Sequence, residues 1–194
     1  GQDGISRIGY AVSDDGIHFR RFPNPALVMK TPSSPKFRNP FAGEGHYDRD
    51  AYASGGGWGG SEDPRAVSID GRLYMNFGVF ESWDSIRVAL TSIGLADLKA
   101  QAWDWAPHFF LSPPNETHKN WVLFPEKIRG KFAILHALTP RVMIDYADSL
   151  EEWAESPVQS NNERGGRKGH WDEFVRGAAA PPLRTKYGWL LLYH

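Results

Sequence analysis

The chain of 194 residues is 41% hydrophobic, 13% aromatic and 23% charged, which is the composition of a folded protein with one domain or two small ones. Its formal net charge of −1 lacks the basic surplus that nucleic-acid binding usually brings, so we expect no nucleic-acid partner. It has no cysteine, which excludes disulfides, thiolate metal sites and cysteine nucleophiles. No apolar run reaches the roughly 18 residues that a membrane-spanning helix needs, so we expect no membrane association.

The two ends of the chain resemble cuts within a longer sequence. The chain begins at Gly1 without a charged and then apolar signal segment, and it stops inside an apolar run at 189–194 that is typical of a strand. We therefore expect a piece of a larger protein. The missing signal segment favours a cytoplasmic location.

Short β-segments dominate the chain from one end to the other. Runs rich in β-branched and aromatic residues alternate with glycine, proline and aspartate, which predicts an all-β fold. Alternating apolar residues predict strands at 73–77 and 132–136. Segments 95–102 and 149–155 favour helices of one or two turns. Twenty glycines and fourteen prolines fit many tight turns.

An internal repeat of about 60 residues is the most informative pattern. Each repeat has a proline, an apolar strand, a turn glycine (Gly71, Gly130 or Gly188) and a second apolar strand. A second pair of strands follows the first, so each unit has four antiparallel strands. Repetition of such a unit predicts a β-propeller, and a small β-sandwich with chance spacing is the alternative.

The repeat assigns the chain to parts of four blades. These are the end of one blade (5–22), two whole blades (61–112 and 119–158) and the first half of another (177–194). A closed propeller needs four to eight blades, so we predict that 1–194 is a single, incomplete propeller domain. The polar segments 23–60 and 159–176 are predicted to be long loops that set specificity on one rim.

Charged residues begin the first strand of two repeats, beside a proline. Asp63 and Arg65 flank Pro64, and Glu126 and Lys127 follow Pro125. First strands of blades line the central channel, so we expect Asp63, Glu126 and Arg184 to face a common hollow. Buried charges cost free energy unless they are paired or used. The pattern thus fits either a substrate site or ion pairs that seal the channel.

Carboxylates among many aromatic residues suggest sugar chemistry. Glycosidic cleavage needs an acid that protonates the leaving oxygen, and aromatic rings stack on the apolar faces of pyranosides. Trp58, Trp121 and Trp171 are predicted platforms, whereas Trp103, Trp105 and Trp153 are predicted to pack in the core. His46, His118 and His170 are expected to be solvated loop residues.

Four strings of the sequence resemble the signatures of glycoside hydrolase family 130. They are SRIGYAVSDDGIHF, GGSEDPRAVSIDGRLYMNF, KNWVLFPEKIRGKFAILH and RGAAAPPLRTKYGWLLLYH, and they cover essentially the whole chain in the family's order. The family contains β-mannoside phosphorylases and related β-mannosidases. The resemblance implies a five-bladed β-propeller that inverts the anomeric configuration and forms mannose 1-phosphate from a β-mannoside oligosaccharide and inorganic phosphate.

The resemblance also implies roles for individual residues. Asp63 would be the general acid, in some members through a sugar hydroxyl. Sugar contacts would come from Arg7, Glu62, Arg65, Glu126 and Lys127. A cationic pocket for phosphate would come from Arg87, Lys119 and His136, because a dianion needs cations to offset its desolvation. Phosphate is the nucleophile, so no second catalytic carboxylate is required.

Departures from the family pattern leave other activities open. Ala137 and Val175 stand where basic residues are frequent, and Ala179 and Ala180 replace a glycine and a proline. Fewer cations would favour an activated water, with Glu126 or another carboxylate as base about 6.5–9.5 Å from the acid, which is β-mannoside hydrolysis. A further alternative is an inactive or sugar-binding propeller fragment.

Neither a metal site nor another cofactor is predicted. No histidine or acidic cluster has the spacing of metal ligands, so inorganic phosphate as co-substrate is the expected small partner. The sequence leaves open whether the protein forms a homo-oligomer.

Overall fold

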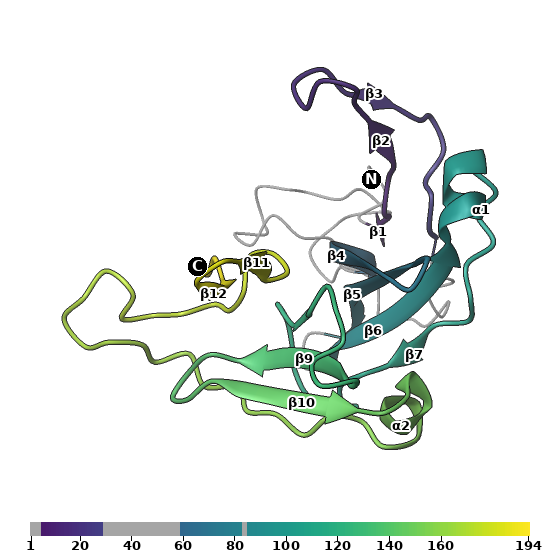
Figure 1. Cartoon of the computed structure of the whole chain (residues 1–194). Coiled ribbons are helices and arrows are strands. Elements are labelled where there is room, and N and C mark those ends of the chain that lie inside the picture. The colour runs from purple at the N-terminus through teal and green to yellow at the C-terminus, as the bar shows by residue number, and fades with distance from the viewer. Residues whose placement is uncertain (1–4, 29–58, 83–84) are drawn as a thin grey trace, which may run out of the picture. The chain divides into compact units, whose positions relative to one another are not determined.

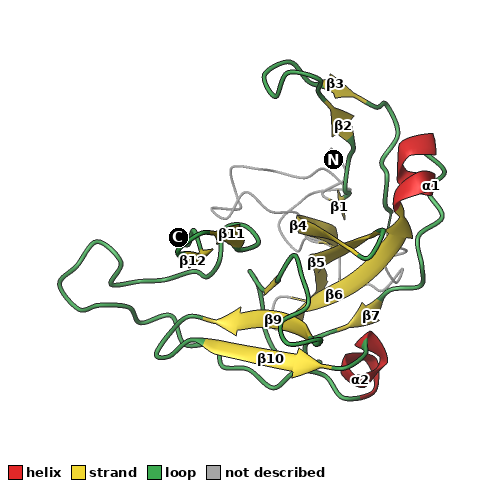
Figure 2. Cartoon of the chain, viewed as in Figure 1, coloured by secondary structure: helices red, strands yellow, loops and turns green. Residues whose placement is uncertain are grey.

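The structure is a computed structural model that describes residues 5–28, 59–82 and 85–194 (Figure 1). Strands make up most of its regular structure (Figure 2), which confirms the all-β prediction. The two helices of the described residues are α1 (Leu95–Ala100) and α2 (Leu150–Glu155), within the two segments predicted to be helical. Neither is long and apolar enough to cross a bilayer.

Twelve strands are described, in four sheets. They are β1 (Ile5–Ser6), β2 (Ala11–Val12), β3 (Arg20–Arg21), β4 (Gly59–Ile69), β5 (Arg72–Ser82), β6 (Ser85–Gly94), β7 (Phe109–Phe110), β8 (Val122–Leu123), β9 (Phe132–Ala137), β10 (Met143–Ala147), β11 (Leu183–Thr185) and β12 (Gly188–Leu190). The sheets have the orders β2-β3, β1-β4-β5-β6-β7, β10-β9-β8 and β11-β12. Each therefore consists of strands consecutive in the chain, apart from β1, which pairs in parallel with β4.

Chain contacts divide the molecule into two compact units. The first, unit 1, comprises Gly1–Glu62 and Val79–Trp83, and the second, unit 2, comprises Asp63–Gly78 and Asp84–His194. In unit 1 the β2–β3 turn is tied by the Asp15 carboxylate, which accepts hydrogen bonds from the backbone of Ile17 and His18. The His18 side chain also contacts this carboxylate and holds the pKa of Asp15 well below its usual range.

The turn glycines of the repeat have the backbone geometry that the repeat requires. Gly71, Gly130 and Gly188 have φ angles of 78°, 83° and 121°. Asp70 and Arg129, directly before the first two glycines, also have positive φ, at 49° and 53°. Two successive positive φ values are typical of the type I′ turn, whose twist matches that of a β-hairpin. The first two predicted hairpins thus have this turn, and the third is the β11–β12 pair, in which Gly188 begins β12 opposite Thr185.

The segment 119–158 differs from the expected four strands. It has three strands, β8 to β10, followed by α2 in the segment predicted to be helical, and the structure describes no fourth strand there. A capping box begins this helix, because the Glu152 side chain accepts hydrogen bonds from the backbone of Asp148 and Ser149. Trp153, buried as predicted, holds the helix on the core.

Apolar side chains cover both faces of β9 in unit 2. Phe132 and Ile134 belong to a core cluster shared with Val67, Tyr74 and Leu90 of the β4–β7 sheet. Ala133 and Leu135, which alternate with them, belong to a second cluster packed against Trp189 and Leu191 of the C-terminal hairpin. Three successive groups of strands in unit 2 therefore pack face to face in chain order, with an apolar layer between neighbours.

Candidate functional site

A polar pocket lies in unit 2, with about 470 Å³ of empty space that includes open solvent. Its walls come from the segment before β8 (117–121), the end of β9 and its following loop (135–139), and two stretches of the long loop between α2 and β11 (161–164 and 175–178). Lys119 and His136, two of the three predicted phosphate ligands, both line it. The structure thus brings this predicted pair together.

Buried aromatic rings support the wall that carries these two residues. The Trp121 ring lies 5.2 Å from the His118 ring and 5.5 Å from the His136 ring, between centroids. Asn76 Nδ2 donates to the Trp121 carbonyl at 2.6 Å in the core. Trp121 was expected to be a sugar platform, but its side chain is only 1% exposed and belongs to the core cluster, so that interpretation was wrong.

The neighbouring histidine also corrects the sequence interpretation. His118 was expected to be solvated, yet it is 2% exposed, and its Nε2 lies 2.6 Å from Glu116 Oε2. Scattered loop histidines are usually solvated, whereas packing against Trp121 buries this one. Of the other two, His170 is exposed as expected, and His46 lies outside the described residues.

His136 is held at the end of β9 by a contact with the long loop. Its Nδ1 lies 2.8 Å from the hydroxyl of Ser160. Burial lowers the pKa of His136, and Asp145 acts in the opposite direction while His118 lowers it further. The neutral imidazole is therefore favoured more than in an exposed histidine.

Arg65 connects the proposed acid to the pocket wall. Its guanidinium donates to the backbone carbonyl of Asp63 at 2.8 Å, to Asn120 Oδ1 at 2.6 Å and to the Ala178 carbonyl at 3.3 Å. Asn120 and Ala178 both line the pocket. Burial lowers the pKa of Arg65, opposed by the charge of Asp63. Among the described residues its buried Nε has no hydrogen-bond partner.

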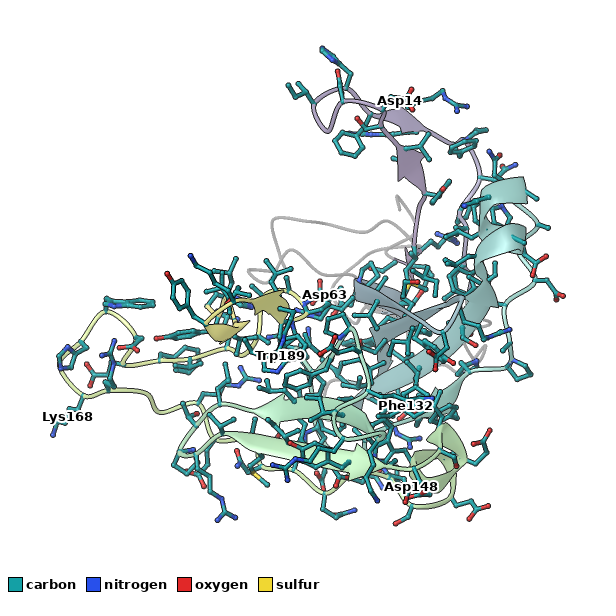
Figure 3. All side chains as sticks on the ribbon, in the orientation of Figure 1. Asp14, Asp63, Phe132, Asp148, Lys168 and Trp189 are labelled. Carbon is teal, nitrogen blue, oxygen red and sulfur yellow. The ribbon has the colours of Figure 1, made fainter. Side chains whose placement is uncertain are left out.

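Asp63 has an uncommon backbone conformation for a residue before proline. Its φ is 53°, in the left-handed region that aspartate tolerates better than most residues. Proline disfavours helical conformations in the residue before it, so this geometry needs external support, which the Arg65 hydrogen bond to its carbonyl supplies. The Asp63 side chain is exposed and is labelled on β4 in Figure 3.

The second charged pair of the repeat lies elsewhere in unit 2. Lys127 Nζ is 2.9 Å from Asp70 Oδ2 and 4.9 Å from the centre of the Phe132 ring. Hydrogen bonding to Asp70 raises the pKa of Lys127. Glu126 is exposed, and neither residue is among those that line the pocket. Their predicted contacts with sugar stay predictions.

The remaining predicted residues have local contacts that leave their roles untested. Arg87 donates from Nε and Nη2 to the Ser112 carbonyl at 3.0 and 2.8 Å and lies 3.7 Å over the Phe110 ring. Arg184 lies 5.1 Å over the Trp189 ring. In unit 1, Arg7 donates to the Ile5 carbonyl, and Glu62 is half-buried. The convergence of Asp63, Glu126 and Arg184 on one channel stays a prediction.

Sequence reasoning missed the side chains that the long loop brings to the pocket. Arg164 and Arg176 line it, together with the carboxylate-bearing Glu163. The loop approaches closely at Gly177, whose φ is 133° and where an added Cβ would lie 2.7 Å from Asn120 Cβ. The loop was predicted, but its path depends on this contact between distant residues, which no local pattern reveals.

The other tryptophans that the sequence singled out differ in exposure. Trp171 is 76% exposed and stacks on Tyr193 with 5.6 Å between ring centroids, whereas Trp58 lies outside the described residues. Trp103 and Trp105 are half-buried.

In the part of the chain that the structure describes, no three histidine or acidic side chains are grouped to hold a metal ion.

Comparisons with known proteins agree with the signature strings. The family model described as beta-1,4-mannooligosaccharide phosphorylase matches residues 52–194. The chain is 34% identical over 198 residues to a 1,2-beta-oligomannan phosphorylase of Thermoanaerobacter sp. (strain X514), covering 98% of this chain and 53% of that protein. It is 29% identical over 145 residues to a beta-1,4-mannooligosaccharide phosphorylase of Ruminococcus albus, covering 71% of this chain and 39% of that protein.

A solved structure has a similar fold. Its description states that the GH130 family of mannoside phosphorylases contains glycoside hydrolases that target beta-1,2 mannosidic linkages in Candida mannan. The two structures match with a TM-score of 0.64 at 21% sequence identity. The match covers 97% of this chain and 51% of that one. The chain spans about half the length of the curated phosphorylases of Thermoanaerobacter sp. (strain X514) that it matches. From the family model and the relatives together, the chain belongs to glycoside hydrolase family 130.

Proposed function

We propose that the protein containing this chain cleaves β-mannosides by phosphorolysis, with inversion, and releases mannose 1-phosphate. A phosphate oxygen forms a bond to the anomeric carbon while the glycosidic bond breaks on the opposite face. The leaving oxygen takes a proton from Asp63, either directly or through a sugar hydroxyl. The observation that carries this proposal is the pocket in which Lys119 and His136 meet.

The charge of the pocket fits a phosphate dianion. Lys119, Arg164 and Arg176 bring three cations to its walls, against the single carboxylate of Glu163 among the lining residues described. Hydrogen bonds between ionised partners are roughly twice as strong as neutral ones, so these groups offset the loss of phosphate hydration. Arg87 stands as a further phosphate ligand in the proposal.

The acid and the sugar contacts belong to the charged strand starts. Asp63 is the proposed general acid, and Arg65 ties its backbone to the pocket wall through Asn120. This link supports a short path between the acid and the bound phosphate. The proposed sugar contacts are Arg7, Glu62, Arg65, Glu126 and Lys127.

For the architecture we propose a five-bladed β-propeller, of which 1–194 supplies the end of blade one, blades two and three, and the first half of blade four. The face-to-face packing of three strand groups in chain order supports it, because propeller blades pack in that way. The remaining strands would come from the rest of the longer protein.

Hydrolysis of the same bond is the second candidate. Ala137 and Val175 line the pocket, so two positions of its wall are apolar where the family often has basic residues. A weaker hold on phosphate would leave the anomeric carbon open to water. The pocket's three cations favour phosphorolysis over this alternative.

The test is the phosphate dependence of the full-length protein. The two relatives aligned over 98% of this chain are named for β-1,2 oligomannan and β-1,2-mannobiose, so β-1,2-mannobiose is the first substrate and β-1,4-mannobiose the comparison. We expect mannose 1-phosphate to form only when phosphate is added. Release of free mannose at the same rate without phosphate would overturn phosphorolysis and establish the hydrolase.

A further inference from the structure

The hydroxyl of Ser160 has two kinds of neighbour. Its Oγ lies 2.8 Å from His136 Nδ1, 3.1 Å from the His136 carbonyl oxygen and 3.5 Å from the Asn161 carbonyl oxygen. A carbonyl oxygen only accepts hydrogen bonds and the hydroxyl has a single proton, so we assign that proton to the His136 carbonyl. Oγ then accepts from His136, which places a proton on Nδ1.

This arrangement fixes what His136 offers to the pocket. With Nδ1–H committed to Ser160, the neutral ring carries its lone pair on Nε2, the nitrogen left for a ligand. Burial lowers the pKa of His136, which favours this neutral form. The charged and titratable groups around the ring are Asp145 and His118 together with the pocket residues Lys119, Glu163, Arg164 and Arg176.

The Nε2 lone pair of His136 can distinguish between two anions that the cations of the pocket attract equally. Near neutral pH the phosphate dianion still carries one P–OH proton, whereas sulfate, of the same charge and similar size, carries none. Lysine and arginine attract either dianion. An accepting nitrogen gains a hydrogen bond from the P–OH group of hydrogenphosphate. With sulfate it faces only an oxygen lone pair and gains none.

We propose that Ser160 is a positioning residue that holds His136 with Nδ1 protonated, so that Nε2 accepts from the P–OH group and the pocket selects hydrogenphosphate over sulfate. The proposal rests on the proposed function, because it assigns phosphate to this pocket. It adds a residue of the long loop to the specificity of the reaction. Arsenate, which also keeps a proton, should replace phosphate.

The wild-type enzyme provides the first measurement. Initial rates of phosphorolysis by the full-length protein are measured with phosphate varied and sulfate as competitor. We expect the inhibition constant of sulfate to exceed the KM for phosphate by about 10-fold or more, the equivalent of one lost hydrogen bond to a desolvated group. The ratio should fall as the pH is lowered, because a protonated His136 donates to either anion.

Substitution of Ser160 separates positioning from general damage. In Ser160→Ala we expect the KM for phosphate to rise about 10-fold, as for other residues that orient a ligand-binding histidine, and the sulfate-to-phosphate ratio to fall towards one. Ser160→Thr keeps the hydroxyl and should restore the ratio. Ser156→Ala, at an exposed serine that ends α2, is the matched control and should leave both constants unchanged.

The outcomes distinguish the inference from the function beneath it. If the wild type cleaves mannobiose without phosphate, the proposed function fails and the inference fails with it. If cleavage needs phosphate but sulfate binds as tightly, or Ser160→Ala keeps the wild-type ratio, the inference alone is wrong. A Ser160→Ala protein that does not fold leaves the wild-type ratio and its pH dependence to decide.

Discussion

Arg65 and Lys127 both lie near the start of a repeat, yet their side chains reach different surroundings. Both follow a carboxylate near a proline at the start of a repeat. Arg65 is partly buried and makes hydrogen bonds to Asp63, Asn120 and Ala178. Lys127 is exposed and pairs with Asp70, in the turn between β4 and β5.

The difference shows what a repeated pattern determines and what it leaves open. The repeat determines the hairpin register, because the turn glycines supply the positive φ that each hairpin needs. It does not determine where a long side chain ends. The planar guanidinium of Arg65 bonds several acceptors at fixed angles, whereas the flexible ammonium of Lys127 takes the nearest carboxylate.

The largest expected effect separates the two carboxylates of the repeat. Asp63→Asn removes the proposed proton donor, and we expect kcat/KM for phosphorolysis to fall by about 10²–10⁴-fold, the usual contribution of general acid catalysis. Glu126→Gln should act mainly on KM, by about 10-fold or less, since one neutral hydrogen bond replaces a charged one. Equal losses of kcat in both variants would contradict the assignment of Asp63 as the acid.

The second largest effect is expected at Arg65, with Lys127 as the comparison. Arg65→Lys keeps the charge but cannot serve Asp63, Asn120 and Ala178 together, so we expect a loss of about 1–3 kcal/mol in unfolding free energy. Activity should fall with it, because the Asp63 backbone loses its support. Lys127→Arg is the matched control and should unfold at the same urea concentration as the wild type. Identical denaturation curves for the two variants would show that Arg65 supports the fold no more than Lys127 does.

A smaller effect concerns pH. The folded-state pKa of His136 lies below its value in the unfolded chain, near 6.5, so the unfolded state binds the proton first on acidification. The contribution of this group is thus complete above the unfolded value and is lost as the pH falls from that value through the lower folded-state pKa. The free energy of unfolding, measured with urea, should decrease over this pH window more in the wild type than in His136→Gln. Parallel pH profiles would refute the burial of a neutral histidine.

The smallest effect is expected at the exposed ion pair. Asp70→Asn removes the carboxylate that raises the pKa of Lys127, but both side chains are solvent-accessible. Surface pairs of this kind contribute little and are screened by salt. We expect a melting temperature close to that of the wild type, with any difference vanishing at high salt. A large, salt-resistant decrease would show that this pair, like Arg65, supports the fold.

Much of the fold was predictable from local features. Turn glycines identified the hairpins, apolar alternation identified β5 and β9, and Ser149 and Glu152 form the capping box of a predicted helix. The two-sided burial of β9 was less evident, since alternation alone suggests one buried face. Only the packing of neighbouring strand groups fills the second face.

The site was predictable to a smaller extent. Lys119 and His136 were identified through the family strings, and they line one pocket. Trp121 was misjudged because an indole serves equally well as core or as platform, and tertiary packing decides between them. Ser160 and Arg176 were missed because the course of an irregular loop depends on contacts distant in sequence.

Gly177 has a consequence for how the long loop can vary. Because the chain passes against Asn120 where no Cβ would fit, the returning end of the loop is pinned at one spot. Asn120 Nδ2 fastens the same spot by donating to the Arg176 carbonyl at 2.9 Å. The stretch 165–174, between the two pocket-lining parts of the loop, can therefore change in length or sequence while the end of the loop stays in place.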